Sequence, residues 1–247
     1  MRRWKNRPEG SNWGDFGDDD QVGRLNLITP ERRRAAIAEA TEGYVFQLCM
    51  PLDYPRGKPV TTVRHPPLLD PTGAYNTTFT PHSHDVFCDD KVSLCLQYST
   101  QWDALAHVGA LFDADGDGIA EMVYYNGFRA CEHILNDDGS GHPHAQALGI
   151  ERMAETCVQG RGVLVDLHGF HGDRHVAVGY DDLMRIMADQ RVEIGTGDIL
   201  CLHTGLTALI IDQGDRFVQS MMATSCPALD GSDDRLLRWI ADSGIAA

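Results

Sequence analysis

Two short apolar runs in the second half of the chain, residues 162–169 and 197–205, alternate with stretches of helical periodicity. The helical stretches are residues 150–158, 180–190 and 232–244. Strands that alternate with helices usually form one sheet that the helices cover, and most of its strands are parallel. The pattern therefore predicts an α/β protein with a mostly parallel central sheet.

Capping residues mark the ends of two helices. Thr29 precedes Pro30 as an N-cap precedes the first helical position, and this helix is predicted to stop at Gly43. In the last helical stretch, Ser232 is the predicted N-cap and Gly244 the predicted C-cap.

The chain is acidic, and its charge and hydropathy exclude some classes of partner. It has 21 Lys and Arg against 36 Asp and Glu, a net charge of −15 over 247 residues. No basic stripe is left to neutralise phosphates, so we expect no nucleic-acid partner. No apolar run reaches the roughly 18–20 residues that span a bilayer, so we expect no membrane partner. Scattered cysteines without a Cys-x-x-Cys pair favour the cytoplasm.

The first 28 residues are polar and turn-rich, yet they carry Trp4, Trp13 and Phe16. Disordered tails usually lack large aromatic side chains. We therefore interpret residues 1–28 as an N-terminal aromatic arm and residues 29–247 as one domain. The arm either closes over a pocket, including that of a neighbouring subunit, or covers exposed core, and we favour the second interpretation.

The segment from Gln97 to His107 carries polar side chains directly after an alternating run. Apolar and polar residues alternate over residues 92–97, which predicts a half-buried strand. If the strand continues, residues 97, 99, 101 and 103 project from one face. The carboxylate of Asp103, the imidazole of His107 and the glutamine amides form a mixed donor set that suits Zn²⁺ or Mn²⁺. A solvated strand end with one incidental histidine is the alternative.

The same segment resembles the signature of the cyclase family that includes kynurenine formamidases and isatin hydrolases. Against the family pattern His-x-Gly-Thr-His-x-Asp-x-Pro-x-His, the matching residues are Thr100, Asp103 and His107. The departures are Gln97, Ser99, Gln101 and Leu105, which stand for His, Gly, His and Pro. The form Gln-x-x-x-Gln-Trp-Asp-x-x-x-His is similar to a branch that includes zinc-dependent lactone hydrolases such as trans-dienelactone hydrolase. Further blocks, including RPEGSNWGDFG, YYNG, QGRGVLVDL and GDILCLHTG, extend the resemblance over essentially the whole chain.

The resemblance implies a fold, a metal and a reaction. The fold is a single domain of the swivelling β/β/α type. Gln97, Gln101 and Asp103 would hold a divalent metal, Zn²⁺ or Mn²⁺, and His107 would act as the catalytic acid/base or as an additional ligand. The implied enzyme is a homo-oligomeric hydrolase of a lactone, lactam or arylformamide that uses a metal-activated water. The alternative is a catalytically impaired family member that binds a small molecule.

The end of the sequence carries a further expectation. Residues 245–247 look like the opening of another strand. Proteins of the family contribute a His and a Glu to the metal centre from near their C-terminus, beyond the point that corresponds to residue 247. We therefore expect this chain to be a shortened version of a longer protein.

Two weaker signals stay open. Asp113, Asp115 and Asp117 have the spacing of a calcium loop, but the twelfth position holds Tyr124 in place of Glu, so we favour an acidic surface turn. Several histidines lie in loops or near strand ends, and for each we favour a solvated or structurally satisfied side chain over a ligand. They are His82, His84, His168, His171 and His203.

Overall fold

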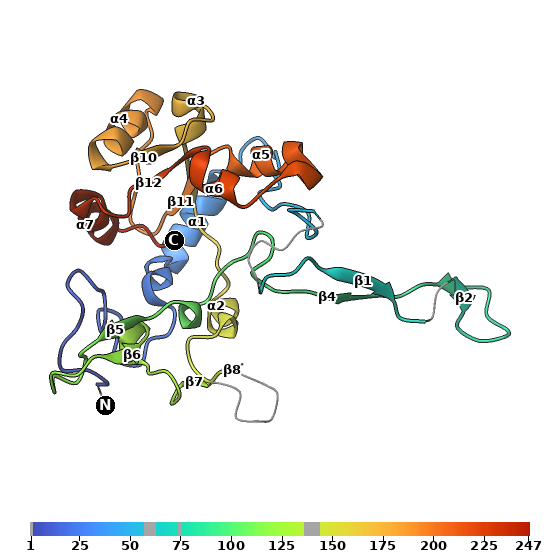
Figure 1. Ribbon diagram of the computed structural model, residues 1–247, viewed down its shortest axis with the longest axis horizontal. Coiled ribbons are helices and arrows are strands. Elements are labelled where there is room, and N and C mark those ends of the chain that lie inside the picture. The colour runs from blue at the N-terminus through green and yellow to red at the C-terminus, as the bar shows by residue number, and fades with distance from the viewer. Residues whose placement is uncertain (1, 57–62, 74–75, 136–143) are drawn as a thin grey trace.

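The computed structural model describes residues 2–56, 63–73, 76–135 and 144–247 of a mixed α/β protein (Figure 1). The α-helices are α1 (Pro30–Ala38), α2 (Ile150–Thr156), α3 (Leu167–His171), α4 (Tyr180–Gln190), α5 (Leu206–Gln213), α6 (Ser220–Thr224) and α7 (Asp234–Asp242). The 3-10 helices are η1 (Gly23–Leu27), η2 (Leu105–His107), η3 (Tyr125–Gly127) and η4 (Gly214–Arg216). The first eight strands are β1 (Leu68–Pro71), β2 (Thr77–Thr78), β3 (Val86–Phe87), β4 (Asp90–Ser93), β5 (Ala110–Phe112), β6 (Glu121–Val123), β7 (Ile134–Leu135) and β8 (His144–Ala145). The last four are β9 (Gly162–Asp166), β10 (Val176–Val178), β11 (Ile199–His203) and β12 (Pro227–Leu229).

The predicted helices of the second half are present. Helix α4 has the predicted bounds, and α2 ends two positions before the predicted end at residue 158. Helix α7 is capped by Asp233 and not by Ser232, because the Asp233 carboxylate accepts the N–H groups of the first turn. Helix α1 has Thr29 as its N-cap, as predicted, but it ends at Ala38, before the predicted stop at Gly43.

The strands form two-stranded sheets within the described residues. Strand β9 pairs in parallel with β11, and β10 pairs in parallel with β12. The pairs β1–β4, β2–β3, β5–β6 and β7–β8 are antiparallel. The mixed α/β class is therefore confirmed, while the parallel pairing of the described strands is limited to these two pairs.

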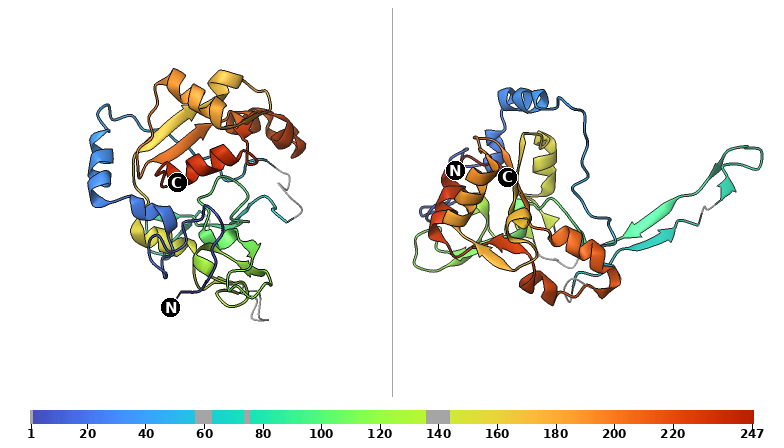
Figure 2. Two further views of the ribbon diagram at one scale, coloured as in Figure 1. Left: turned by 90° about the vertical axis from the view of Figure 1, so that its left-hand side faces the viewer. Right: turned by 90° about the horizontal axis from the view of Figure 1, so that it is seen from above.

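The largest hydrophobic cluster holds the parallel pairs and their helices together. Val165 of β9 and Val178 of β10 are fully buried against Leu183 and Ile186 of α4 and Leu236 of α7. Figure 2 shows α4 and α7 beside these strands. Leu183 and Ile186 lie three positions apart, so they share one face of α4.

The predicted strand through residues 92–97 is shorter than expected. Strand β4 ends at Ser93, and the chain then turns. Tyr98 is buried and its hydroxyl donates to the carbonyl of Pro55, while Ser99 donates to Pro51 O at 3.0 Å. Thr100 Oγ1 accepts from Met50 N at 3.1 Å. These bonds tie the segment to residues 50–55, so it does not continue a ladder, and residues 97, 99, 101 and 103 do not share a strand face.

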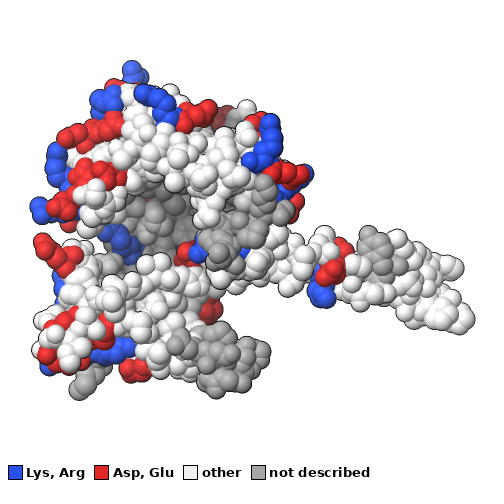
Figure 3. All heavy atoms as spheres, viewed as in Figure 1, with Lys and Arg blue, Asp and Glu red and all other residues white. Residues whose placement is uncertain are grey.

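A long hairpin built from β1–β4 and β2–β3 projects away from the body (Figure 1). Its apolar side chains are exposed: Leu68, Leu69, Phe79 and Val86 are 64–71% accessible. Phe79 and Phe87 stack with ring centroids 4.2 Å apart. Figure 3 shows few charged side chains on the visible face of the hairpin.

The N-terminal residues lie on the β5–β6 hairpin. Trp4 and Trp13 are buried in a cluster with Ala114 and Val123, and their rings meet edge to face at 5.6 Å. Asn126, which is fully buried, binds the arm through its amide. These contacts agree with an arm that covers core, whereas the division into domains at residue 28 stays a prediction.

The last residues of the sequence run along the edge of β11. Ala246 N donates to Asp198 O at 2.8 Å, and Leu200 N donates to Ala247 O at 2.8 Å. Ile245 and Ala246 are buried.

Among the described helices, none is long and apolar enough to cross a membrane.

One carboxylate, that of Asp233, caps two helices. Its Oδ1 accepts from Arg235 N at 2.9 Å and Leu236 N at 3.2 Å in α7, and its Oδ2 accepts from Tyr180 N at 2.7 Å in α4. The hydrogen bond from Tyr180 N is the largest cause that holds the pKa of Asp233 below its ordinary value of 3.8.

Because of this lowered pKa, the free energy of unfolding depends on pH in the acid range. A carboxyl group whose native pKa is depressed contributes stability that is fully present above its unfolded pKa and is lost as the pH falls through its native pKa. We therefore expect the free energy of unfolding to fall as the pH decreases below 3.8, and we expect the Asp233→Asn variant to lose part of that dependence. Urea unfolding at several pH values in this acid range measures how steeply the free energy of unfolding changes with pH, both in the unsubstituted protein and in the Asp233→Asn variant. Asp234→Asn, at an exposed neighbouring acid, is the control, and equal slopes in the two variants would contradict the capping role.

Candidate functional site

Asp103 and His107 form a pair at the start and end of one short turn. The Nδ1 atom of His107 is hydrogen-bonded to Oδ1 of Asp103, and both side chains are about half exposed. Between them, Ala104 and Ala106 are buried against Phe128 and Leu148. The small alanines fix η2 to the body, so the side chains of the two predicted site residues face outward.

The two glutamines of the predicted site lie on either side of a turn. Gln97 is half-buried and Gln101 is exposed, and in the described part of the chain neither side-chain amide has a hydrogen-bond partner. Gln101 and Asp103 line the same cavity, whereas Gln97 and His107 are not among its lining residues. The structure thus brings together Asp103 with His107, and Gln101 with Asp103, but not all four as one set.

The cavity beside Asp103 has a volume of about 440 Å³. Trp102, Leu105 and Met153 line it, together with η1 of the arm and the C-terminal residues Ala246 and Ala247. The indole N–H of Trp102 points to Sδ of Met153 at 3.2 Å. The cavity therefore has largely apolar walls, with the Asp103 carboxylate and the Gln101 amide as polar groups.

Tyr125 and Arg24 add polar groups to the same walls. The Tyr125 hydroxyl donates to Oδ2 of Asp20 at 2.9 Å, and burial, followed by this hydrogen bond, strongly raises the pKa of Tyr125. Arg24 donates to Ala241 O at 2.6 Å and to Ile245 O, and burial lowers the pKa of its guanidinium. Tyr125 therefore stays neutral, while Arg24 holds the arm to the end of α7.

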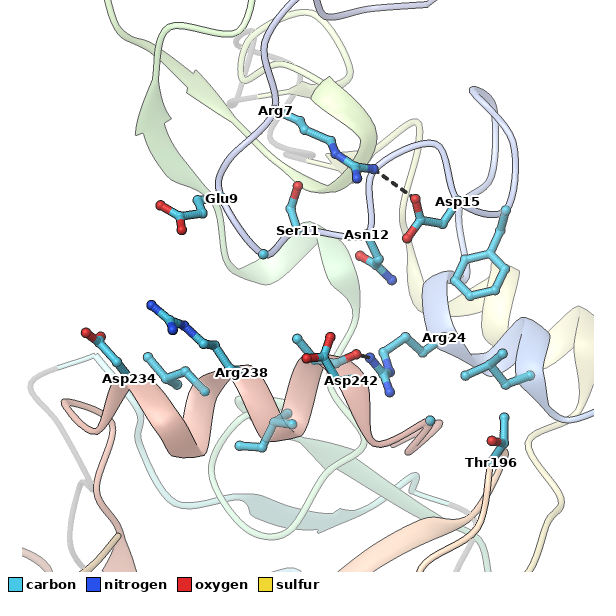
Figure 4. A pocket seen from close by; sticks show the side chains of 17 residues that line it. Arg7, Glu9, Ser11, Asn12, Asp15, Arg24, Thr196, Asp234, Arg238 and Asp242 are labelled. Carbon is cyan, nitrogen blue, oxygen red and sulfur yellow. Dashed lines mark hydrogen bonds and ion pairs between the residues drawn. The ribbon is translucent and has the colours of Figure 1, made fainter. Parts of the chain in front are cut away.

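A larger cavity of about 980 Å³ adjoins the first and shares Asn12 and Arg24 with it. It lies between the arm and α7 (Figure 4). Arg7 on its arm side is paired with Asp15 at 2.8 Å, and Arg238 lies on the α7 side. None of the predicted site residues lines this cavity.

The acidic loop after the pair gathers three carboxylates. Ligand atoms of Asp113, Asp115 and Asp117 lie within 4.8 Å of one another, and within the described ranges no other group of three His, Cys, Asp or Glu side chains does so. Asp113 accepts the backbone N–H groups of Gly116, Asp117 and Gly118. These bonds fold the loop without an ion, so the group can hold a cation but does not require one.

The sequence did not predict two further His–Asp contacts, which lie near the carboxyl ends of β9 and β11. His203 Nδ1 lies 2.7 Å from Asp166 Oδ1, and His168 Nε2 lies 2.8 Å from Asp173 Oδ1. The position of both histidines near strand ends was visible in the sequence. The register that places Asp166 opposite His203 was not.

Two comparisons with known proteins indicate the same family. A family model described as "Putative cyclase" matches residues 46–247. A crystal structure described as that of a novel cyclase is 33% identical, with a TM-score of 0.72, and the alignment covers 95% of this chain and 72% of that one. A search of curated protein sequences found no match.

Proposed function

We propose that this chain, which belongs to the cyclase family, is a metal-dependent hydrolase that cleaves a lactone, a lactam or an arylformamide. The observation that carries the proposal is the Asp103–His107 pair, next to a cavity with apolar walls. A cavity of about 440 Å³ is of a size that holds small planar molecules.

The donor set fits a divalent metal in its chemistry. Asp103 supplies an anionic oxygen, Gln97 and Gln101 supply neutral amide oxygens that have no protein partner among the described residues, and His107 supplies an imidazole nitrogen. These are ligands of Zn²⁺ and Mn²⁺. A bound metal would polarise the scissile carbonyl and lower the pKa of a bound water to about 7.

In the proposed mechanism, His107 transfers the proton and the cavity walls position the substrate. Since Asp103 holds Nδ1 of His107, Nε2 is the nitrogen that can take a proton and return it to the leaving group. Trp102 and Leu105 would hold the ring of the substrate and exclude water around the reacting bond.

The proposal also covers the detailed arrangement of the fold, the location of the protein in the cell and its oligomeric state. We propose the swivelling β/β/α arrangement with a mostly parallel central sheet, and a cytoplasmic location. We also propose a homo-oligomer, and the exposed apolar side chains of the β1–β4 hairpin support it, because large exposed apolar surfaces mark interfaces.

One observation favours a second candidate function. Glutamines stand where the family pattern has histidines, and Asp103 and His107 gather no third His, Cys, Asp or Glu within the described ranges. A family member that has lost the metal would bind the small molecule in the same cavity without cleaving it.

Metal removal tests the proposal. We expect the chain to hydrolyse at least one of dihydrocoumarin, isatin and formanilide, and we expect a chelator to reduce the rate at least about tenfold. Added Zn²⁺ or Mn²⁺ should restore it. Hydrolysis at an unchanged rate in the presence of the chelator would contradict the proposed metal dependence. Binding of one of these compounds without hydrolysis, at any metal content, would favour the binding protein.

A further inference from the structure

The carboxyl ends of the parallel strands β9 and β11 carry a cluster of two histidines and two aspartates. Asp166 and His203 are the last residues of their strands and lie opposite each other in the register. His168 follows in the first turn of α3, and Asp173 lies just beyond that helix. In open α/β sheets, ligands bind outside the carboxyl ends of the strands.

Each imidazole in the cluster is held by a carboxylate through one nitrogen. Asp166 holds Nδ1 of His203, and Asp173 holds Nε2 of His168. Nε2 of His203 and Nδ1 of His168 have no hydrogen-bond partner in the described part of the chain. Metal-ligating histidines nearly always donate their other ring N–H to a carboxylate, a backbone carbonyl or a water, and a carboxylate partner fixes the tautomer and makes the ligating nitrogen more basic.

The spacing of the two rings suits one shared cation. Their centroids are 5.4 Å apart and their planes are inclined by 65°. Two imidazoles bound to one tetrahedral zinc, with Zn–N distances of about 2.0–2.1 Å, place their ring centroids roughly 5 Å apart.

The backbone around the cluster leaves room for these side chains. A Cβ added to Gly205, which has a φ of +81°, would lie 2.2 Å from Cδ2 of His168. A Cβ on Gly169 would lie 2.4 Å from Oδ2 of Asp166, and Gly169 N donates to Oδ1 of the same carboxylate at 2.7 Å. The Gly169 N–H therefore helps to hold the Asp166 carboxylate in place against Nδ1 of His203.

We propose that His168 and His203 form a binding site for a transition-metal cation of the zinc type, with Asp173 and Asp166 as the carboxylates that orient them. Water or an external ligand completes the coordination. This site is independent of the proposed hydrolase centre at Asp103, since it uses none of the same residues.

Zinc titration of the full chain tests the proposal. The experiment uses the Asp103→Ala background after treatment with a chelator, and isothermal titration calorimetry at about pH 7.5, where ordinary imidazoles are neutral. We expect roughly one equivalent of Zn²⁺ to bind. We expect His203→Ala and His168→Ala each to weaken binding at least about tenfold, and Asp173→Asn to weaken it about 10–100-fold.

Two further variants keep the result interpretable. His65→Ala removes an exposed histidine elsewhere and should leave the affinity unchanged. Asp173 has a side chain that is 79% exposed, so Asp173→Asn should fold normally and report on the orientation of His168 alone. No zinc uptake in the Asp103→Ala background, or equal affinity in all the histidine variants, would overturn the proposal.

Discussion

Replacing Asp103 by alanine is expected to remove the metal of the proposed hydrolase centre, roughly one equivalent of the total metal content, and to reduce turnover by about 10³-fold or more, the largest effect that we expect for any single side chain of that centre. Asp103 supplies the one anionic oxygen of the proposed donor set, and Gln97 and Gln101 are neutral. Without the metal, the pKa of the attacking water stays far above the value of about 7 that a bound metal gives it. Elemental analysis of the purified protein and kcat on the best substrate measure the two losses together.

His107→Ala separates the two roles that are open for His107. An acid/base His107 predicts a variant that keeps its metal and loses about 10²–10⁴-fold in kcat. A ligand His107 predicts that metal and turnover fall together. Asp70→Ala, at an exposed acid on β1, is the matched control and should keep both. Full metal content and full activity in Asp103→Ala would contradict the proposed centre.

Replacing Asn126 by alanine is expected to destabilise the fold by about 3–5 kcal/mol, the largest loss of stability that we expect from a polar side chain. Oδ1 of Asn126 accepts from Gly14 N at 2.8 Å, and Nδ2 donates to Gly17 O at 3.0 Å and Asp20 O at 2.9 Å. The variant leaves these backbone groups without their partner, and each such group that stays buried costs about 1–3 kcal/mol. Alanine is also strained at the left-handed backbone of this residue, where φ is 54°.

Urea unfolding measures the global loss, and hydrogen exchange measures where it occurs. We expect the amides of residues 2–20 to exchange faster in Asn126→Ala, because the arm loses its anchor. Asn76→Ala is a matched control, since Asn76 has a similar φ of 51° but is exposed. It should cost only about 1 kcal/mol. A similar loss in both variants would mean that backbone strain, and not the anchor, explains the effect.

The elements that could be predicted from sequence are those whose signals are local. The bounds of α4 follow from apolar residues that recur at helical spacing, with Leu183 and Ile186 on the buried face. Strands β9 and β11 follow from short apolar runs between turn residues. Asp103 and His107 could be grouped in advance by their donor chemistry and by the resemblance to the family motif.

The elements that could not be predicted depend on distant partners. Periodicity alone extends the strand through residue 97, but Tyr98 is buried against residues near Pro55 and turns the chain there. In the same way, no local pattern reveals that His203 lies opposite Asp166, because strand register is decided by packing between elements that lie far apart in sequence. The His–Asp cluster therefore became visible only in the structure.

The anchoring of the arm by Asn126 has a consequence for how the chain folds during its synthesis. The three hydrogen bonds span 106, 109 and 112 residues, so the arm leaves the ribosome long before its partner exists. At about 5–20 residues per second, that interval is roughly 5–20 s. Throughout it, Trp4 and Trp13 have no β5–β6 hairpin to cover. The arm is thus synthesised before its partner yet is among the later parts to reach its native place, and its aromatic side chains are open to chaperones or to other nascent chains until then.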